Sequence, residues 1–152
     1  FIQEERNLNL LFRGSNNQRL VDVQKTMECG EVVLLNEYEY NEETKTYTRY
    51  ARKKLQTDYI TGEPVTTKNI IITMCDNYTL KDSENKGRQG LKNIGTFDGY
   101  YITNGNAIPI KCTKTARGEQ TIYKDLDGDE IEVNDGNTFI NICPTSAEVV
   151  IE

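Results

Sequence analysis

The sequence of 152 residues contains no histidine and no tryptophan. The absence of histidine excludes a Ser-His-Asp triad, a His-ligated zinc site and an imidazole proton shuttle. None of the three serines stands in a G-x-S-x-G motif, where many hydrolases carry their nucleophile. The glycine-rich motifs that bind nucleotide phosphates are also missing. The sequence therefore favours a protein that is not an enzyme and holds no cofactor or metal.

Long hydrophobic runs are absent as well. The longest, such as residues 32–35 and 70–72, are far shorter than the roughly 20 apolar residues of a membrane-spanning helix. The net charge is −6, from 18 basic and 24 acidic residues, and an acidic protein is repelled by nucleic-acid phosphates. We therefore expect no nucleic-acid partner. Because the chain begins at Phe1 with neither a methionine nor a signal sequence, we expect it to be part of a longer protein.

What the sequence does contain is an excess of β-branched and aromatic residues. There are 14 Ile, 8 Val and 17 Thr against 4 Ala and 10 Leu, together with 9 Tyr and 4 Phe. β-Branched side chains lose rotamer freedom in a helix and pack well on a pleated sheet. The composition therefore predicts a mainly β protein with little helix, and the length fits one domain.

Alternation of apolar and polar residues indicates about eight to ten short strands. Asn104-Gly105 and Asp127-Gly128 are the strongest hairpin signals, because such pairs accept a type I′ turn. We predict an antiparallel meander that forms a barrel or a sandwich. Residues 1–144 would be this single domain, with its boundary within residues 1–30 left open, and residues 145–152 a tail. The predicted strands are residues 7–13, 19–27, 31–40, 46–50, 69–75, 99–103, 107–113, 119–125, 129–133 and 138–143.

The four cysteines, Cys29, Cys75, Cys112 and Cys143, stand far apart. No C-x-x-C pair exists, which excludes a zinc ribbon and a thioredoxin motif. Two alternatives stay open. The cysteines are small apolar residues buried in strands, or one disulfide joins Cys112 to Cys143 or to Cys75, as in an exported protein.

The acidic residues 125–130 are the one stretch similar to a calcium-binding loop. An EF-hand loop that began at Asp125 would need a glutamate at its twelfth position, but Gly136 stands there. The stretch is therefore interpreted as a type I′ hairpin turn with solvated carboxylates.

A long polar segment, residues 76–93, is the first candidate for contact with a partner. Loops of this length in a compact domain are usually functional or mobile. This one carries Lys81, Lys86, Arg88 and Lys92 on an otherwise acidic chain. A basic loop of this kind steers encounter with an acidic partner, so these four residues are the predicted partner-binding residues.

Tyrosines are the second candidate. Tyr47 and Tyr50 lie on one predicted hairpin and Tyr100 and Tyr101 on another, and exposed aromatic rings could stack on sugars. Alternation would bury about half of them, so that they would fill the core instead.

A series of segments, taken in order, is similar to a known family. They are residues 40–49 (YNEETKTYTR), Asp58, 61–64 (TGEP), 67–72 (TKNIII), 99–110 (GYYITNGNAIPI), 123–131 (YKDLDGDEI) and 136–144 (GNTFINICP). The series resembles the C-terminal domain of YerB-type bacterial lipoproteins, the family known as domain of unknown function 3048. It covers roughly residues 30–144 and, more weakly, residues 8–30.

The resemblance implies a β-rich domain that follows a separate N-terminal domain, exported and tethered outside the cytoplasmic membrane by a lipid on an upstream cysteine. It supplies no substrate and no catalytic residue. Two positions depart from the family pattern. Gln56 stands where the family implies a histidine, two residues before Asp58, and Cys112 stands where it implies an aromatic residue. The first departure argues further against imidazole chemistry.

We therefore expect a non-catalytic, extracytoplasmic interaction domain of a cell-envelope lipoprotein. Its expected partner is an envelope protein or a cell-wall polymer, and its expected contact with the membrane is only through the upstream lipid. An alternative is a carbohydrate-binding or wall-processing module that uses surface tyrosines. A structural spacer is a third hypothesis.

Overall fold

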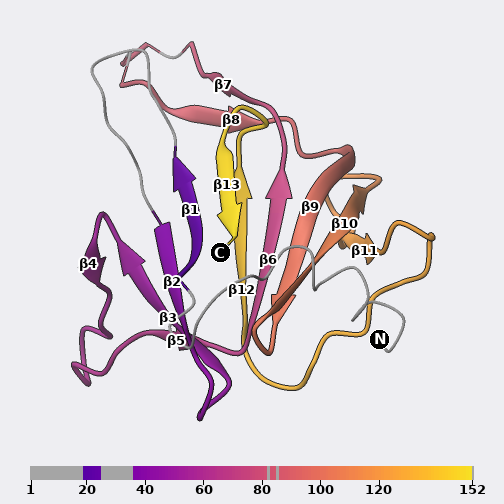
Figure 1. Cartoon of the computed structure of the whole chain (residues 1–152). Helices are drawn as coiled ribbons and strands as arrows, with labels where there is room; N and C mark the ends of the chain where they lie inside the picture. The colour runs from indigo at the N-terminus through magenta and orange to yellow at the C-terminus, as the bar shows by residue number, and fades with distance from the viewer. Residues whose placement is uncertain (1–18, 25–35, 82, 85, 152) are drawn as a thin grey trace.

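The computed structural model describes residues 19–24, 36–81, 83–84 and 86–151, and within them all regular structure is β-strand. Figure 1 shows the strands in two main groups with a separate two-stranded ribbon above them. The strands are β1 (Arg19–Gln24), β2 (Asn36–Asn41), β3 (Thr46–Ala51), β4 (Lys54–Leu55), β5 (Thr66–Thr67), β6 (Asn69–Met74), β7 (Asn77–Thr79), β8 (Gln89–Leu91), β9 (Gly95–Thr103), β10 (Asn106–Lys114), β11 (Ile122–Lys124), β12 (Thr138–Cys143) and β13 (Glu148–Ile151).

The first sheet has the order β13-β1-β2-β3-β4, and β5 also pairs with β3. Its centre is the β2–β3 hairpin, in which Tyr40 lies opposite Tyr47. This hairpin was predicted from alternation on both sides of a polar turn, and the structure confirms it. The turn itself is held by Asn41, whose side-chain oxygen accepts hydrogen bonds from the backbone amides of Glu43 and Thr44.

The second sheet has the order β11-β10-β9-β6-β12. Asn104 and Gly105 both have positive φ, 49° and 74°, so the predicted type I′ turn between β9 and β10 is confirmed. Strand β6 is central and almost wholly buried, as its continuous apolar run predicts. Strand β12, however, runs parallel to β6, so a purely antiparallel meander was wrong for this pair. The reason is that β12 follows a long connection and enters the sheet at its edge.

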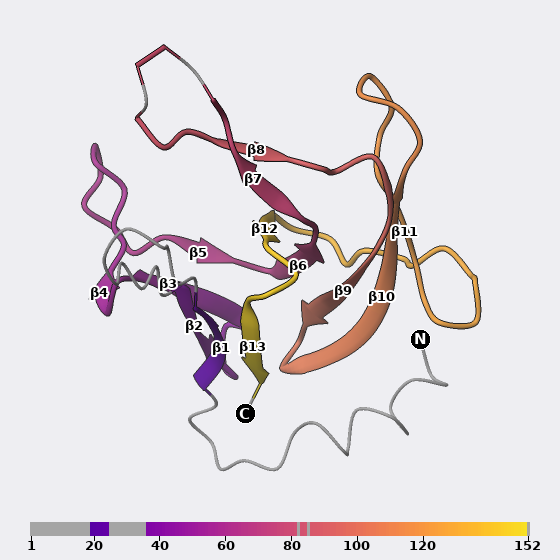
Figure 2. The same cartoon turned by 90° about the horizontal axis from the view of Figure 1, so that it is seen from above.

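The two sheets pack face to face as an open sandwich rather than a closed barrel (Figure 2). The core between them joins residues of both sheets, among them Tyr38, Tyr47, Ile70, Ile72, Ile102 and Ala107. A second apolar cluster lies on the other face of the second sheet and contains Ile71, Tyr101, Ile108, Ile110 and Cys112. Tyr123 and Ile131 pack against this second cluster. The second sheet is therefore covered on both faces, which explains the long apolar run of β6.

The C-terminal residues differ from the prediction of a tail. Residues 148–151 form β13, which pairs with β1 at the edge of the first sheet. The chain leaves β12 through a turn in which the Ala147 amide donates to the Pro144 carbonyl. The last residues thus link the two sheets, because β12 belongs to one and β13 to the other.

The acidic turn differs too. Only Gly128 has a positive φ, 97°, so the turn is not of type I′. The predicted strand 129–133 is reduced to one bridge between Lys124 and Glu130. The predicted strand 7–13 and Cys29 lie outside the described residues.

The three described cysteines are buried free thiols. Cys143 belongs to the core between the sheets, and Cys112 belongs to the cluster on the opposite face of the second sheet. The two lie on different sides of one sheet, so the disulfide alternative was wrong for this pair. Cys75 is likewise unpaired, which excludes its predicted pairing with Cys112.

Candidate interaction surface

Strands β7 and β8 form a ribbon of their own, which we call the arm (residues 76–94). It stands apart from both sheets in Figures 1 and 2. Beyond the strand pairing, the Leu80 amide donates to the Arg88 carbonyl at 2.7 Å and the Lys92 amide to the Asp76 carbonyl at 2.8 Å. The segment predicted as a long loop therefore contains a short two-stranded hairpin.

The arm has two chemically different faces. Asn77, Thr79 and Gln89 share one face. The side-chain Nδ2 of Asn77 donates to Gln89 Oε1 at 2.8 Å, and Gln89 Nε2 donates to Thr79 Oγ1 at 3.1 Å. Side chains alternate along a strand, so Tyr78 and Leu80 lie on the opposite face. Their exposed fractions are 46% and 38%. One face of the arm thus carries a polar ladder with the exposed Leu91 beside it, and the other face carries Tyr78 and Leu80 and is open to solvent.

Gly90 shapes the apolar face. It lies directly opposite Tyr78 in the ribbon. A Cβ atom at Gly90 would lie 2.4 Å from the Tyr78 ring, so the tyrosine lies flat over a residue that has no side chain. This packing fixes the ring on the arm while leaving its outer side free for contact.

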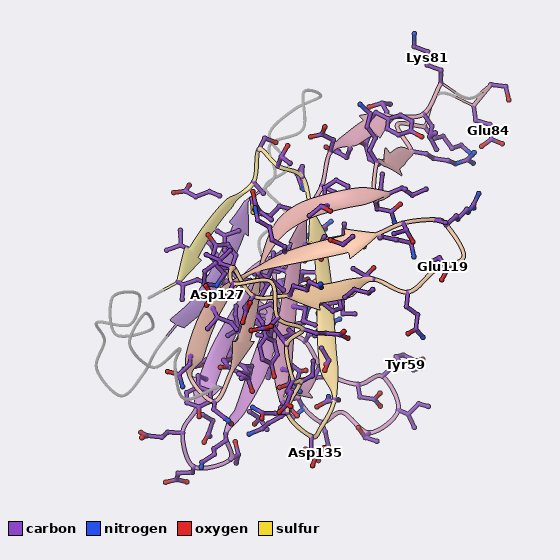
Figure 3. All side chains as sticks on the ribbon, turned by 90° about the vertical axis from the view of Figure 1, so that its right-hand side faces the viewer. Tyr59, Lys81, Glu84, Glu119, Asp127 and Asp135 are labelled. Atoms are coloured by element: carbon purple, nitrogen blue, oxygen red, sulfur yellow. The ribbon has the colours of Figure 1, made fainter. Side chains whose placement is uncertain are left out.

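The predicted basic residues do lie on the arm, but they do not form one free cationic patch. Lys86 is 3.1 Å from Glu84 Oε2, and the Arg88 guanidinium pairs with the same carboxylate. Lys81 and Lys92 are exposed and make no ion pair with the described residues. Figure 3 shows Lys81 and Glu84 at the outer end of the arm. The arm therefore presents two exposed cations, Lys81 and Lys92, beside two further cations that share one carboxylate.

The predicted aromatic surface is wrong for two of its four members. Tyr47 and Tyr101 are 0% and 1% exposed, because each fills a core cluster. Tyr50 and Tyr100 are partly exposed but belong to different sheets. The Tyr50 phenol donates to Glu39 on the outside of the first sheet, whereas Tyr100 packs against the core between the sheets. These four tyrosines do not form a common row for a sugar chain.

A second exposed apolar feature was missed by the sequence analysis. We call it the Tyr59 turn (residues 56–65), and it connects β4 to β5. Tyr59 is 100% exposed and Ile60 is 90% exposed. The available signal was the segment Asp58 to Gly62, in which Asp, Thr and Gly at these spacings are typical of a tight, capped turn.

The Tyr59 turn is held by its own hydrogen bonds. Asp58 Oδ1 accepts from the amides of Ile60 and Thr61 at 2.9 Å each, and from the Thr61 hydroxyl at 3.2 Å. These donors lower the pKa of the Asp58 carboxyl, the Thr61 amide being the largest cause. Gly62 has a φ of +73° and donates its amide to the Asp58 carbonyl. The ionised Asp58 therefore keeps Tyr59 and Ile60 at the tip of a defined turn.

The neighbouring turn between β3 and β4 is basic and unusual in its backbone. Arg52 and Lys53 have positive φ values of 53° and 63°, a conformation that costs about 1–2 kcal/mol for a residue with a side chain. Asn-Gly would fit the same type I′ turn without that cost. Arg52, Lys53 and Lys54 are all exposed. Strained backbone that serves no core contact is often found at functional surfaces.

Gln56 lies at the base of the Tyr59 turn, where its amide donates to the Arg49 carbonyl at 3.0 Å. Its side-chain Oε1 is buried and accepts no hydrogen bond. This is the position at which the family pattern implies a histidine.

In the described part of the chain, no three acidic or cysteine side chains gather as metal ligands would. Asp125 has a structural partner instead, since its carboxylate accepts from the Asp129 amide at 2.9 Å. No helix in that part is long and apolar enough to cross a membrane.

The fold defines the class of this protein as an open two-sheet β-sandwich with a projecting ribbon. The chain belongs to the family "Protein of unknown function (DUF3048) C-terminal domain", whose model matches residues 26–140. The resemblance seen in the sequence is thereby confirmed.

Two further comparisons agree with this assignment. The chain is 28% identical over 121 residues to "Putative lipoprotein YerB" of Bacillus subtilis, covering 74% of this chain and 32% of that protein. The crystal structure of YerB from Bacillus subtilis matches with a TM-score of 0.71 at 26% identity, over 91% of this chain and 46% of that one. The chain thus spans less than half the length of the relatives it matches.

Proposed function

We propose that this chain is a non-catalytic interaction domain of an extracytoplasmic, membrane-anchored lipoprotein, and that its arm binds a partner protein of the cell envelope. The observation that carries the proposal is the apolar face of the arm. Tyr78 and Leu80 are exposed there, and the opposite face, which also exposes Leu91, satisfies its own polar groups. A surface of this kind gains free energy when a partner covers it.

The stability of the ribbon supports the same proposal. A two-stranded hairpin is marginally stable in water by itself, and among the described strands β7 and β8 pair only with each other. The described ladder consists of three pairs of residues, Asn77–Leu91, Tyr78–Gly90 and Thr79–Gln89. A partner that packs against the ribbon would supply the contact that two short strands lack.

The charge of the arm supports a protein partner whose contact surface has an acidic rim. The arm sequence carries four cations and three carboxylates, whereas the whole chain has a net charge of −6. Lys81 and Lys92 would face the rim, and the Tyr78 ring would lie at the centre of the contact, where aromatic residues are enriched. The location outside the cytoplasmic membrane is supported by a relative described as a lipoprotein.

A photo-crosslinking amino acid placed along the arm tests the proposal. Position 80 reports on the apolar face, and position 79, its neighbour on the polar face, is the matched control. In intact cells that express the full-length protein, we expect a discrete protein adduct from position 80 and little or none from position 79. Equal adducts from both positions, or adducts only with wall polymer, would contradict a face-specific protein contact.

Charge reversal tests the second part of the proposal. The Lys81→Glu and Lys92→Glu changes together should weaken adduct formation and remove its dependence on salt concentration. Lys124→Glu changes an exposed cation on β11, outside the arm, and should leave the adduct unchanged. If both variants behave alike, the arm cations do not contact the partner.

A further inference from the structure

Tyr59 and Ile60 are the most exposed large apolar side chains among the described residues. The Asp58 hydrogen bonds keep them from folding back onto the sandwich. Figure 3 shows Tyr59 at the outside of the molecule, away from both sheets. A rigid convex tip that carries one aromatic and one aliphatic side chain is suited to entering an apolar medium.

The sequence around the tip carries positive charge. Residues 52–63 contain three Lys or Arg and two acidic residues, Asp58 and Glu63. Arg52 and Lys53 are exposed on the adjoining turn. One oxygen of the Asp58 carboxylate is already occupied by the turn. The region therefore complements a surface that is both apolar and negatively charged.

We propose that the Tyr59 turn contacts the surface of a bilayer that contains anionic phospholipid. Ile60 would enter the boundary of the acyl chains, the Tyr59 ring would lie at the level of the headgroups, and Arg52, Lys53 and Lys54 would lie near lipid phosphates. This contact differs from a lipid anchor, because it is made by the domain's own side chains.

Two arguments favour a bilayer over a pocket on a protein. Two side chains on a convex tip bury far less than the roughly 1,600 Å² of a standard protein interface. A bilayer surface, in contrast, needs no matching pocket, and it accepts a few exposed apolar side chains and nearby cations in a weak contact.

The inference does not depend on the proposed function of the arm, since it needs lipid alone. The Tyr59 turn and the arm nevertheless lie on one side of the molecule. Tyr59 and Lys81 project to the same side of the molecule in Figure 3. With the Tyr59 turn on the bilayer, the arm would face partners that are bound to the same membrane.

The absence of tryptophan from the chain makes a direct experiment possible. Tyr59→Trp introduces a single fluorophore at the tip, and Leu126→Trp introduces one at another exposed turn. Vesicles of phosphatidylglycerol and phosphatidylcholine should shift the emission of the Tyr59→Trp variant to shorter wavelength and leave that of the Leu126→Trp variant unchanged. Pure phosphatidylcholine vesicles should cause a smaller shift. Equal shifts for both variants, or no shift for the variant with the fluorophore at the tip, would overturn the proposal.

Sedimentation with the same vesicles gives a second measurement. A Tyr59→Ser, Ile60→Ser variant should bind at least about tenfold more weakly, as should one with Arg52, Lys53 and Lys54 changed to Glu. Leu126→Ser is the control and should bind as the unchanged protein does. Because Tyr59 is fully exposed, the serine variant should keep its thermal stability. Unchanged binding of this variant would refute the contact.

Discussion

The phenol oxygen of Tyr47 accepts a hydrogen bond of 2.8 Å from the backbone amide of Gly105. Tyr47 lies on β3 of the first sheet, and Gly105 lies in the β9–β10 turn of the second. The bond therefore joins the two layers of the sandwich at one end. Lys68 strengthens the same junction, because its ammonium donates to the Lys45 carbonyl and to the Asn104 side chain.

Tyr47→Phe should lower the free energy of unfolding by about 2 kcal/mol, because the Gly105 amide loses its acceptor in a part-buried place. Urea denaturation measures the change. Tyr50→Phe removes a phenol that donates to Glu39 on the exposed surface and should cost less than about 0.5 kcal/mol. Equal losses would show that the Tyr47 bond does not hold the layers together.

Asn69→Leu should be among the most destabilising polar substitutions in the chain. Asn69 is fully buried, and its Oδ1 accepts from the Tyr101 phenol at 3.1 Å and from the Thr103 hydroxyl at 2.8 Å. Its Nδ2 donates to the Asn134 carbonyl at 2.8 Å. Leucine would remove these hydrogen bonds, and a weaker one from Nδ2 to the Thr138 hydroxyl at 3.4 Å, from a buried place, and we expect a loss of about 3 kcal/mol.

The matched control for Asn69 is Asn106→Ala. Asn106 is exposed and its side chain donates only to the nearby Asn104 carbonyl, so its loss should cost about 0.5 kcal/mol. A chemical-denaturation midpoint for the Asn69 variant as high as for the control would contradict the role of the buried network.

Gly99→Ala should destabilise the second sheet by about 3 kcal/mol. A Cβ atom at Gly99 would lie 2.1 Å from the Ile72 carbonyl oxygen and 2.8 Å from the Cys112 sulfur, so the backbone of β6 would have to move. Gly118→Ala meets no atom within 4 Å and should be nearly neutral. Thermal melting of both variants distinguishes a packing requirement from a general effect of losing glycine.

Stability should fall in alkaline solution. Burial raises the pKa of the Cys143 thiol from 9.0 to about 11, and burial also raises the pKa values of the Tyr38 and Tyr47 phenols. The folded state therefore favours the protonated groups. The contribution of Cys143 is complete below pH 9, the value of the unfolded thiol, and is lost as the pH rises towards 11.

Urea midpoints measured between pH 9 and pH 11, the range set by the Cys143 thiol, test this expectation. Cys143→Ala should show a shallower decline over that range than the unchanged protein, although its stability at neutral pH is lower because a buried side chain is truncated. Parallel declines for the two proteins would show that the Cys143 thiol does not titrate differently in the folded state.

Several local elements could be predicted from the sequence because their causes are local. The β2–β3 hairpin follows from alternation around a polar turn, and the β9–β10 turn follows from Asn104-Gly105. The arm cations were also placed on one segment, but their pairing with Glu84 was not foreseen. A charge count along the chain does not say which side chains meet in space.

The Tyr59 turn shows why some candidates were missed. Tyr59 and Ile60 look like ordinary core residues by composition, and nothing in the residue types places them outside. Their exposure is decided by Asp58, whose hydrogen bonds close the turn before the two side chains can reach the sandwich. The same limit applies to Tyr47 and Tyr101, which look like surface candidates and are buried.

By itself, the sequence determined that this chain is a histidine-free, mainly β domain of a recognisable family, because strand propensity, turn chemistry and segment order are read along the chain. Only the tertiary structure decided that β12 runs parallel to β6 and that β13 pairs at the edge of the other sheet. These pairings join residues far apart in sequence, and alternation specifies a buried face without naming the partner strand. Which tyrosines and cations reach the surface follows from those pairings.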